Sequence, residues 1–214
     1  MNDRLLNGRY ATIRRIVKLP ANQEASVRYA ADHKDQTRER LLESSGAIAK
    51  RGGFSASGVA GLMKAIGLTG GAFYSHFSSK DELFAAIVRR ELSHSLELLG
   101  GGEAGGSDAN RAKLRRCLAR YLSMAHVRRP DSGCAIPSLG AEIARAEPAV
   151  REEAERWLRQ LQEAWSEVLG DPQLAWALIA QCVGALLLAR MMASAQGQEE
   201  VLAASRGLIE KTLG

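Results

Sequence analysis

The amino-acid sequence predicts an all-α fold, with a small N-terminal head of three helices and a larger helical body. Apolar residues recur at three- and four-residue steps through most of the chain after residue 34, which is the period of an amphipathic helix. Gly and Pro residues stand at the boundaries of these segments. Two short segments joined by a glycine-containing turn, between residues 57 and 77, indicate a helix-turn-helix.

The first two helices of the head are marked by their apolar faces and their ends. The first is expected from Lys34 to Arg51, and Gly52 can end it. Ser57 can cap the second helix, which Gly67 ends. The apolar face of the second helix consists of Val59, Leu62, Met63 and Ile66.

The third helix is expected from Thr69 to Phe77, with Thr69 as its N-cap. Phe73 and Phe77 share one face and hold this short helix against its neighbours, because a helix of this length is marginal alone. In a helix-turn-helix, the second helix of the motif lies in the DNA major groove with its N-terminal residues nearest the bases. Gly70 to Ala72 occupy that end.

The body begins with a capping box of Ser79 and Glu82, which predicts a helix from Lys80 to about Leu99. Five glycines between residues 100 and 107 then interrupt the helical pattern. Pro137 disturbs a weaker helix, and a loop is expected at 128–133. The remaining helices are expected at 108–127, 134–146, 149–169, 171–195 and 199–213.

The segment 34–90 resembles the TetR family of bacterial transcriptional regulators. The residues that carry the resemblance are Thr37, Arg38, Leu42, Gly52 to Phe54, and, within the run from Gly67 to Leu83, Phe73, Tyr74, His76, Phe77, Lys80 and Leu83. The resemblance implies a helix-turn-helix DNA-binding domain at 34–80 and a helical effector-binding and dimerisation domain at 81–214. It implies a cytoplasmic regulator, most simply a repressor, that binds a palindromic operator in double-stranded DNA as a homodimer and is released by a small-molecule effector. No cofactor, metal or catalytic residue is expected.

The resemblance and the motif together predict the residues that contact DNA. Tyr74, His76 and Lys80 are expected to contact phosphates, although ordinary surface exposure explains them too. Relatives often carry Arg or Lys where this chain has two glycines, so readout is expected to depend on the turn at Thr69, on the preceding helix and on DNA shape. The predicted DNA-binding set is Lys34, Arg38, Ser57, Thr69, Gly70, Gly71, Tyr74, His76 and Lys80.

Aromatic and Met side chains in the body can line a cavity for an apolar effector, although a helical core requires the same residue types. The candidates are Tyr121, Met124, Trp157, Trp165 and Trp176. The helix around 174–189 is apolar on most of its circumference, which favours burial in a dimer. At sixteen residues, this stretch is shorter than the roughly 20 needed to span a membrane.

The three cysteines, Cys117, Cys134 and Cys182, form neither a disulfide framework nor a zinc motif, which is typical of a reducing cytoplasm. Cys134 follows two arginines, so an alternative function is a redox or electrophile sensor; a small buried residue is the simpler interpretation. A second alternative is a small helical hydrolytic enzyme that uses His126, Asp131 and Cys134.

The formal net charge of +5 is concentrated at the N-terminus, where residues 1–31 hold six Arg or Lys against two acids. We expect residues 1–33 to form a disordered extension, with residues 1–26 outside the folded regulator. The alternative is a basic arm that contacts phosphates. The run from Val27 to Lys34 resembles the usual opening of a TetR-family protein.

Overall fold

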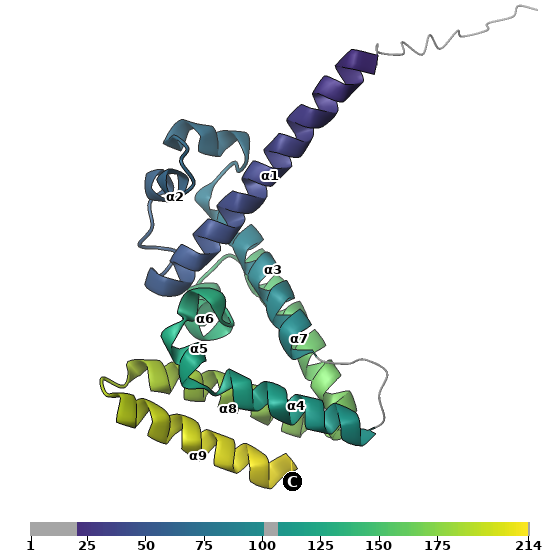
Figure 1. The fold of residues 1–214 in the computed structure, drawn as a ribbon, viewed down its shortest axis with the longest axis vertical. Helices are drawn as coiled ribbons and strands as arrows, with labels where there is room; N and C mark the ends of the chain where they lie inside the picture. Colours follow the sequence, from purple (N-terminus) through teal and green to yellow (C-terminus); the bar gives the residue numbers. More distant parts are fainter. Residues whose placement is uncertain (1–20, 101–106, 214) are drawn as a thin grey trace, which may run out of the picture. The chain divides into compact units, whose positions relative to one another are not determined.

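The computed structural model describes residues 21–100 and 107–213, which are all-helical with no strand in these ranges (Figure 1). The predicted all-α class is therefore confirmed. The elements are α1 (Ala21–Gly52), α2 (Val59–Ala65), the 3-10 helix η1 (Gly70–Ser75), α3 (Lys80–Leu99), α4 (Ser107–Tyr121), α5 (Met124–Arg128), the 3-10 helix η2 (Pro130–Ser132), α6 (Ile136–Ala144), α7 (Pro148–Leu169), α8 (Pro172–Met191) and α9 (Ala195–Leu213).

The chain divides into two compact units, Met1–Gln36 and Thr37–Gly214. In the first unit, α1 begins at Ala21, earlier than the predicted start at Lys34. Residues 1–20, which include most of the predicted extension, lie outside the described residues. Within the second unit, we call the α1 residues from Thr37 onward, α2 and η1 the head, and α3 to α9 the body.

The helix-turn-helix of the head consists of α2 and η1. Gly67 has φ of 76° and ends α2, as predicted, with the amide of Leu68 donating to the carbonyl of Met63 (2.9 Å). The expected α-helix from Thr69 to Phe77 is instead a 3-10 helix. Two consecutive glycines have low α-helix propensity, and 3-10 geometry suits a piece this short.

Two predicted N-caps also differ from the structure. Thr69 occupies the N-cap position of η1, but its side chain makes no capping hydrogen bond. The N-cap of α2 is Gly58, because the Ser57 hydroxyl donates to the Gly53 carbonyl (3.2 Å) instead. In contrast, the predicted cap of α3 is confirmed, since the Glu82 amide donates to the Ser79 hydroxyl (3.0 Å).

The head has an aromatic and aliphatic core. Phe73 and Phe77 are 0% and 1% exposed, and their ring centroids lie 5.9 Å apart, which confirms their predicted packing role. The same core extends into α3 and into the parts of α6 and α7 that face the head. Its other fully buried large side chains are Leu41, Leu62, Met63, Leu83, Ile87 and Leu139.

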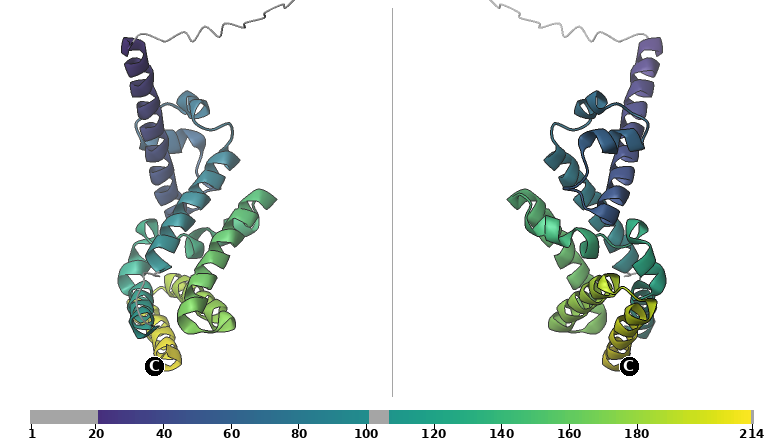
Figure 2. Two further views of the ribbon diagram at one scale, coloured as in Figure 1. Left: turned by 90° about the vertical axis from the view of Figure 1, so that its right-hand side faces the viewer. Right: turned by 90° about the vertical axis from the view of Figure 1, so that its left-hand side faces the viewer.

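The second core lies in the body, where α8 packs between α7 and α9 (Figures 1 and 2). The single helix predicted at 108–127 is divided into α4 and α5, because the Ser123 hydroxyl accepts from the His126 amide (3.3 Å) and caps a new helix. The end of α8 at Met191 and the start of α9 at Ala195 both precede the predicted positions.

Among the described residues, α8 is the one helix long and apolar enough to cross a membrane. Of its most apolar 18-residue stretch, 39% is buried within the chain. At 20 residues, α8 is longer than the predicted sixteen-residue apolar stretch, so the prediction that it is too short to span a membrane was wrong. Its buried side supports the interpretation as a core helix. The buried residues of α8 are Ala175, Leu178, Ile179, Cys182, Ala185, Leu186 and Ala189.

Candidate functional site

Four of the predicted DNA-binding residues lie in η1 or at its N-cap. Tyr74 is 70% exposed, and its ring meets the buried Phe73 ring edge-on at 5.3 Å. Thr69 and Gly71 are also exposed. A Cβ at Gly70 would lie 3.9 Å from the Ala60 Cα, so α2 and η1 pack closely at this position. Thr69, Gly71 and Tyr74 are thus exposed at η1, whereas Gly70 is half-buried against α2.

Gly71 faces open space, because a Cβ built on it meets no atom within 4 Å. Its φ is not in the left-handed region that favours glycine, so the fold does not require glycine here. A glycine on an exposed surface lets another molecule approach the backbone closely, which is its remaining physical consequence.

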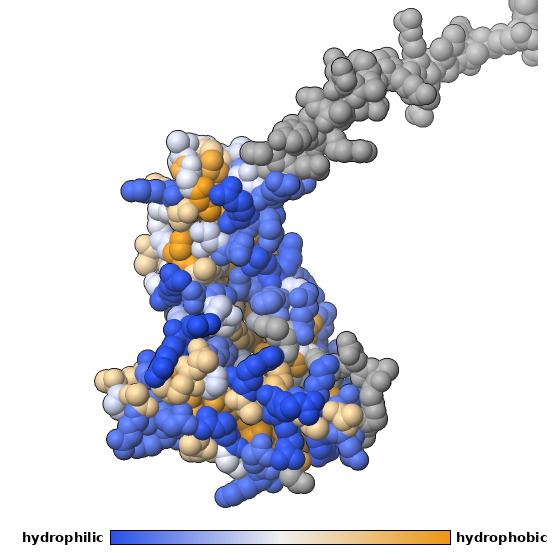
Figure 3. Space-filling model, viewed as in Figure 1, coloured by the Kyte–Doolittle hydropathy of each residue, from blue (hydrophilic) through white to orange (hydrophobic). Residues whose placement is uncertain are grey.

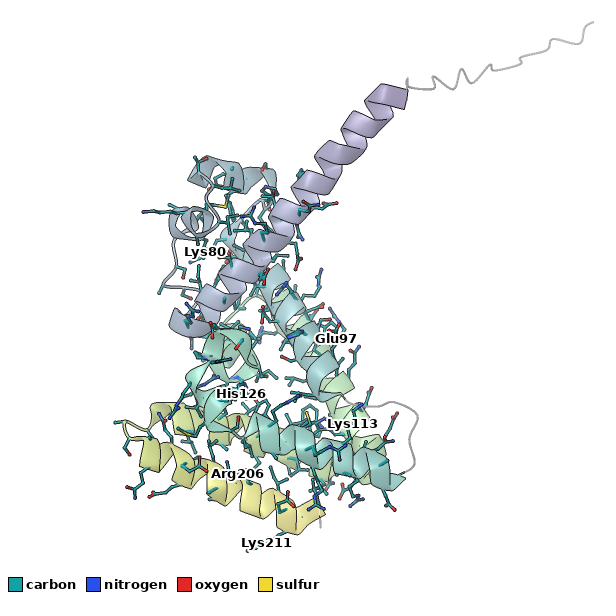
Figure 4. The ribbon with its side chains drawn as sticks, in the orientation of Figure 1. Lys80, Glu97, Lys113, His126, Arg206 and Lys211 are labelled. Carbon is teal, nitrogen blue, oxygen red and sulfur yellow. The ribbon has the colours of Figure 1, made fainter. Side chains whose placement is uncertain are left out.

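Two of the predicted DNA-binding cations, Arg38 and Lys80, contact aromatic rings. The Arg38 guanidinium lies 4.6 Å from the Phe77 ring centroid. The Lys80 ammonium, labelled in Figure 4, donates to the Ser55 carbonyl (3.1 Å) and lies 4.9 Å from the Phe54 ring centroid. Such contacts orient long side chains and lower the entropy lost when they bind another group.

A carboxylate at the start of α3 faces Arg38. Hydrogen bonds from the Ser78 hydroxyl and amide to the Glu82 side chain (2.6 and 2.7 Å) lower the pKa of Glu82, and the charge of Arg38 lowers it further. Glu82 therefore remains ionised and fixes the loop between η1 and α3.

The other three predicted DNA-binding residues are placed differently. Ser57 is half-buried and donates to Gly53. His76 is also half-buried and follows the last residue of η1, with its amide donating to the Phe73 carbonyl (2.9 Å). Lys34 is exposed in the first unit, Met1–Gln36, and is described there alone.

A carboxylate of α6 connects the body to the turn before α2. The Glu142 carboxylate accepts from the Phe54 amide (2.8 Å), the Ser55 amide (2.8 Å) and the Ser55 hydroxyl (2.7 Å). Burial raises the pKa of Glu142, but these hydrogen bonds outweigh that effect and lower it. The ionised carboxylate thus holds the start of the helix-turn-helix.

A buried ion pair forms the second connection between head and body. The Lys50 ammonium donates to the Glu91 carboxylate (2.6 Å) and to the Gly133 carbonyl (3.2 Å). The side chains of Lys50 and Glu91 are only 4% and 5% exposed. A Cβ at Gly46 would lie 2.7 Å from the Glu91 carboxylate, so a glycine leaves room for this pair. The end of α1 is therefore bonded to the loop that precedes α6.

Two adjoining cavities lie in the body beside α4, with volumes of about 380 and 210 Å³. Of the predicted effector-binding residues, Trp165 lines the larger and Tyr121 the smaller. Trp176 lines a separate cavity of about 410 Å³. Met124 packs against the body core, and Trp157 donates from its ring nitrogen to Glu153 (3.1 Å).

The geometry around Cys134 differs from a catalytic triad. The His126 Nε2 accepts from the Cys134 backbone amide (3.0 Å), while its Nδ1 lies 2.8 Å from the Tyr121 carbonyl. Asp131 pairs with Arg51 rather than with the imidazole. Thus the histidine positions a backbone, and the sequence-based triad of His126, Asp131 and Cys134 does not assemble.

Burial also affects the ionisation of these groups. Desolvation lowers the pKa of His126, and the nearby positive charges of Arg190 and Lys50 lower it further. Its neutral form, protonated on Nδ1, matches both observed hydrogen bonds. Burial raises the pKa of the Cys117 thiol, although Arg120 opposes that effect.

Sequence reasoning missed the residues that connect head and body, namely Lys50, Glu91 and Glu142. Their partners are separated by 41 to 88 residues in the chain, and no local pattern indicates such a pair. A basic stripe on α4, at Lys113, Arg116 and Arg120, was also missed, although its spacing of three and four residues is visible in the sequence.

The comparisons agree with the fold and with the head. The model for bacterial regulatory proteins of the tetR family matches residues 41–87. The HTH-type transcriptional repressor NemR of Escherichia coli K12 is 27% identical over 190 residues, which cover 81% of this chain and 94% of that protein.

Solved structures are similar over most of the chain. The crystal structure of the reduced form of E. coli NemR has a TM-score of 0.60 at 26% identity, covering 80% of this chain and 96% of that one. A TetR transcriptional regulator from Chloroflexus aurantiacus J-10-FL has a TM-score of 0.68 at 22% identity and supports the fold, covering 84% and 96% of the two chains.

Proposed function

Since the chain belongs to the TetR family and is a DNA-binding transcriptional regulator, we propose that it represses by binding a palindromic operator as a homodimer and dissociates when its body binds a small molecule. The observation that carries the proposal is the exposed surface of η1 on a helix-turn-helix fixed by the aromatic core of the head. We place the protein in the cytoplasm, with no membrane partner.

The dimer is supported by an apolar surface of α8 and α9. Its exposed large side chains are Trp176, Leu187, Leu188, Met191, Met192 and Leu208. Several exposed large apolar side chains on two packed helices are typical of an interface. Two symmetric heads then read half-sites about 34–36 Å apart. Leu188→Asp, at a side chain that is 50% exposed, is expected to shift sedimentation toward the monomer.

Contacts with DNA are assigned by side-chain type and position. We propose that Tyr74, Lys80, Arg38 and Lys34 contact phosphates, and that His76 supports them from the end of η1. Thr69, Gly70 and Gly71 form the part of η1 nearest the bases, with Ser57 in the turn before α2. Indirect readout of DNA shape supplies the remaining specificity.

The connections at Lys50 and Glu142 supply a path for regulation. The Gly133 carbonyl that accepts from Lys50 lies in the wall of the smaller cavity. A ligand that displaces this wall weakens a bond to α1 and changes the position of the head. By linkage, DNA then weakens ligand binding by the same factor.

The test is fluorescence anisotropy with an operator fragment and a random fragment over a salt series. Lys80→Ala is expected to weaken binding to both fragments and to reduce the salt slope by about 1. Thr69→Ala is expected to narrow the affinity difference between the two fragments. The proposal fails if the protein binds random DNA as tightly as any fragment selected from its own genome.

A second candidate for the regulatory signal is modification of a thiol. Cys134 is only 8% exposed, but it lines the smaller cavity together with Cys117. Release of DNA after treatment with a maleimide, lost in Cys134→Ser and retained in Cys182→Ser, supports this candidate. Unchanged DNA binding after complete labelling of Cys134 excludes it.

A further inference from the structure

The two cavities beside α4 form adjoining parts of one region, because Leu99, Cys117 and Arg120 line both. The larger cavity has an apolar floor, formed by Leu99, Leu114, Trp165 and Val168. Trp165 is held in place, since its ring nitrogen donates to the Leu99 carbonyl (2.9 Å). In Figure 3, apolar atoms are visible between the hydrophilic side chains on this part of the body. The region is therefore suited to the apolar part of a ligand.

The charged side chains of the same region all have one sign. Lys113, Arg116 and Arg120 lie three and four residues apart on α4 and line the larger cavity; Lys113 is labelled in Figure 4. Neither cavity has an Asp or Glu among the described residues that line it. None of these three cations forms an ion pair with a carboxylate in the part of the chain that the structure describes.

The other arginines of α4 provide an internal comparison. Arg115, on a different face, pairs with Glu210 of α9. Arg111 donates to the Leu169 carbonyl (3.5 Å) at the end of α7. The helix thus uses these two arginines for contacts within the body, whereas the three cations at the cavity have no carboxylate partner among the described residues.

A buried hydroxyl lines the smaller cavity. Tyr121 is 6% exposed, and the Cys134 thiol is the neighbour of its hydroxyl, which has no oxygen or nitrogen partner among the described residues. Burial, and then the neighbouring Cys134, raise the pKa of Tyr121, so the group is a donor at neutral pH. A buried donor without an acceptor costs free energy that a ligand oxygen can recover.

We propose that the two cavities bind an organic carboxylate with an apolar body. The carboxylate binds Arg120, whose planar guanidinium suits two parallel hydrogen bonds, with Arg116 and Lys113 adding positive charge. The apolar body packs on Trp165 and its neighbours, and Tyr121, which lines the smaller cavity with Arg120, donates to a carboxylate oxygen. This inference names the class of the proposed effector, and only its consequence for DNA rests on the proposed function.

The binding test uses the full chain without DNA. Titration calorimetry compares 2-naphthoate and decanoate with 2-naphthamide and decanamide, which keep the apolar body and remove the charge. We expect at least one carboxylate to bind at least tenfold more tightly than its amide. Equal affinity for the acid and the amide, or no heat from either acid, would overturn the proposal.

Matched variants separate the cavity from general positive charge. Arg120→Gln is expected to weaken carboxylate binding about tenfold or more, because it removes a charge-assisted pair. Arg115→Gln removes the same charge from the same helix outside the cavities and is expected to change affinity less than twofold. Tyr121→Phe keeps the ring and is expected to cause a smaller loss. Equal losses in the two arginine variants would contradict the site.

The same probes then distinguish this inference from the regulatory function. Carboxylate binding that depends on Arg120 and also releases operator DNA supports both. Binding that depends on Arg120 but leaves operator affinity unchanged supports the site and rejects its role as the effector site. DNA release that is equal in wild type and Arg120→Gln rejects this site and leaves the DNA-binding function intact.

Discussion

The head and the α4 region of the body differ in how they are packed. In the head, Phe73 of η1 and the following Phe77 are at most 1% exposed and anchor η1 in the core. Beside α4, two adjoining cavities remain open, and the buried Tyr121 hydroxyl has no oxygen or nitrogen partner in the described chain. A close-packed core resists small displacements, whereas an open region accepts a ligand or a rearrangement. The contrast indicates a rigid reader joined to an adjustable body.

The joints between the two regions are polar. Glu142 holds the turn before α2, and Lys50 bonds both Glu91 and the Gly133 carbonyl. Hydrogen bonds depend strongly on geometry, so a small shift of a wall in the body can change them, while dispersion contacts in the head are spread over many atoms. A perturbation is therefore expected to act differently in each region.

The largest effect is expected from Phe73→Ala in the head. Removing a fully buried ring is expected to lower the free energy of unfolding by about 3–5 kcal/mol and to abolish operator binding, because η1 loses its support. Chemical denaturation and anisotropy measure both quantities. The neighbouring Tyr74→Ala, at a 70% exposed site, should reduce DNA affinity with little loss of stability. Equal losses of stability in the two variants would contradict the assignment of Phe73 to the core and of Tyr74 to the surface.

Lys50→Met tests the joint and is expected to lower the free energy of unfolding by about 3 kcal/mol, since it leaves Glu91 buried without its partner. Arg51→Met is the control. Arg51 reaches the same loop through Asp131, but its side chain is 65% exposed, so a loss of about 0–1 kcal/mol is expected. Thermal and chemical unfolding measure the stability of both variants and of the wild type. Similar losses would show that burial does not decide the strength of this joint.

The two regions also differ in how much of them the sequence predicts. The Ser79 cap, the turn at Gly67 and the paired rings of Phe73 and Phe77 are local signals, and all three were predicted correctly. The type of η1 was predicted wrongly, because two consecutive glycines weaken the α-helix and Thr69 makes no capping hydrogen bond.

In the body, the important contacts join distant segments. The partner of Lys50 lies 41 residues away, and Glu142 reaches back 88 residues to Phe54. Helical periodicity identifies a face but does not identify the element that it meets. Of the five proposed effector-binding residues, Tyr121 and Trp165 line the two cavities beside α4, and the other three do not. The sequence could not separate these groups, because aromatic content alone does not distinguish a cavity wall from a core.

A smaller effect is expected on acidification, through His126. Its pKa in the folded protein is lowered below the ordinary value of about 6.5, so the unfolded chain binds the proton more readily. The stabilisation is therefore complete above about pH 6.5 and is lost as the pH falls through the folded-state value. Protonation of Nε2 also removes the acceptor of the Cys134 amide. Denaturation from pH 5 to 8 should show a smaller dependence of stability on pH in His126→Gln than in wild type, and an unchanged dependence would contradict this role of His126.

The smallest change in stability, with the opposite sign to the others, is expected from Gly71→Ala. The added methyl meets open space, and alanine loses less backbone entropy on folding than glycine, so unfolding should require about 0.5–1 kcal/mol more. If Gly71 serves close approach to DNA, operator affinity should nevertheless fall, because the methyl projects toward the groove. Gly61→Ala, on an open site of α2, is the control for helix propensity. Stability and DNA affinity that rise together in Gly71→Ala would show that the head does not present this surface of η1 to the bases.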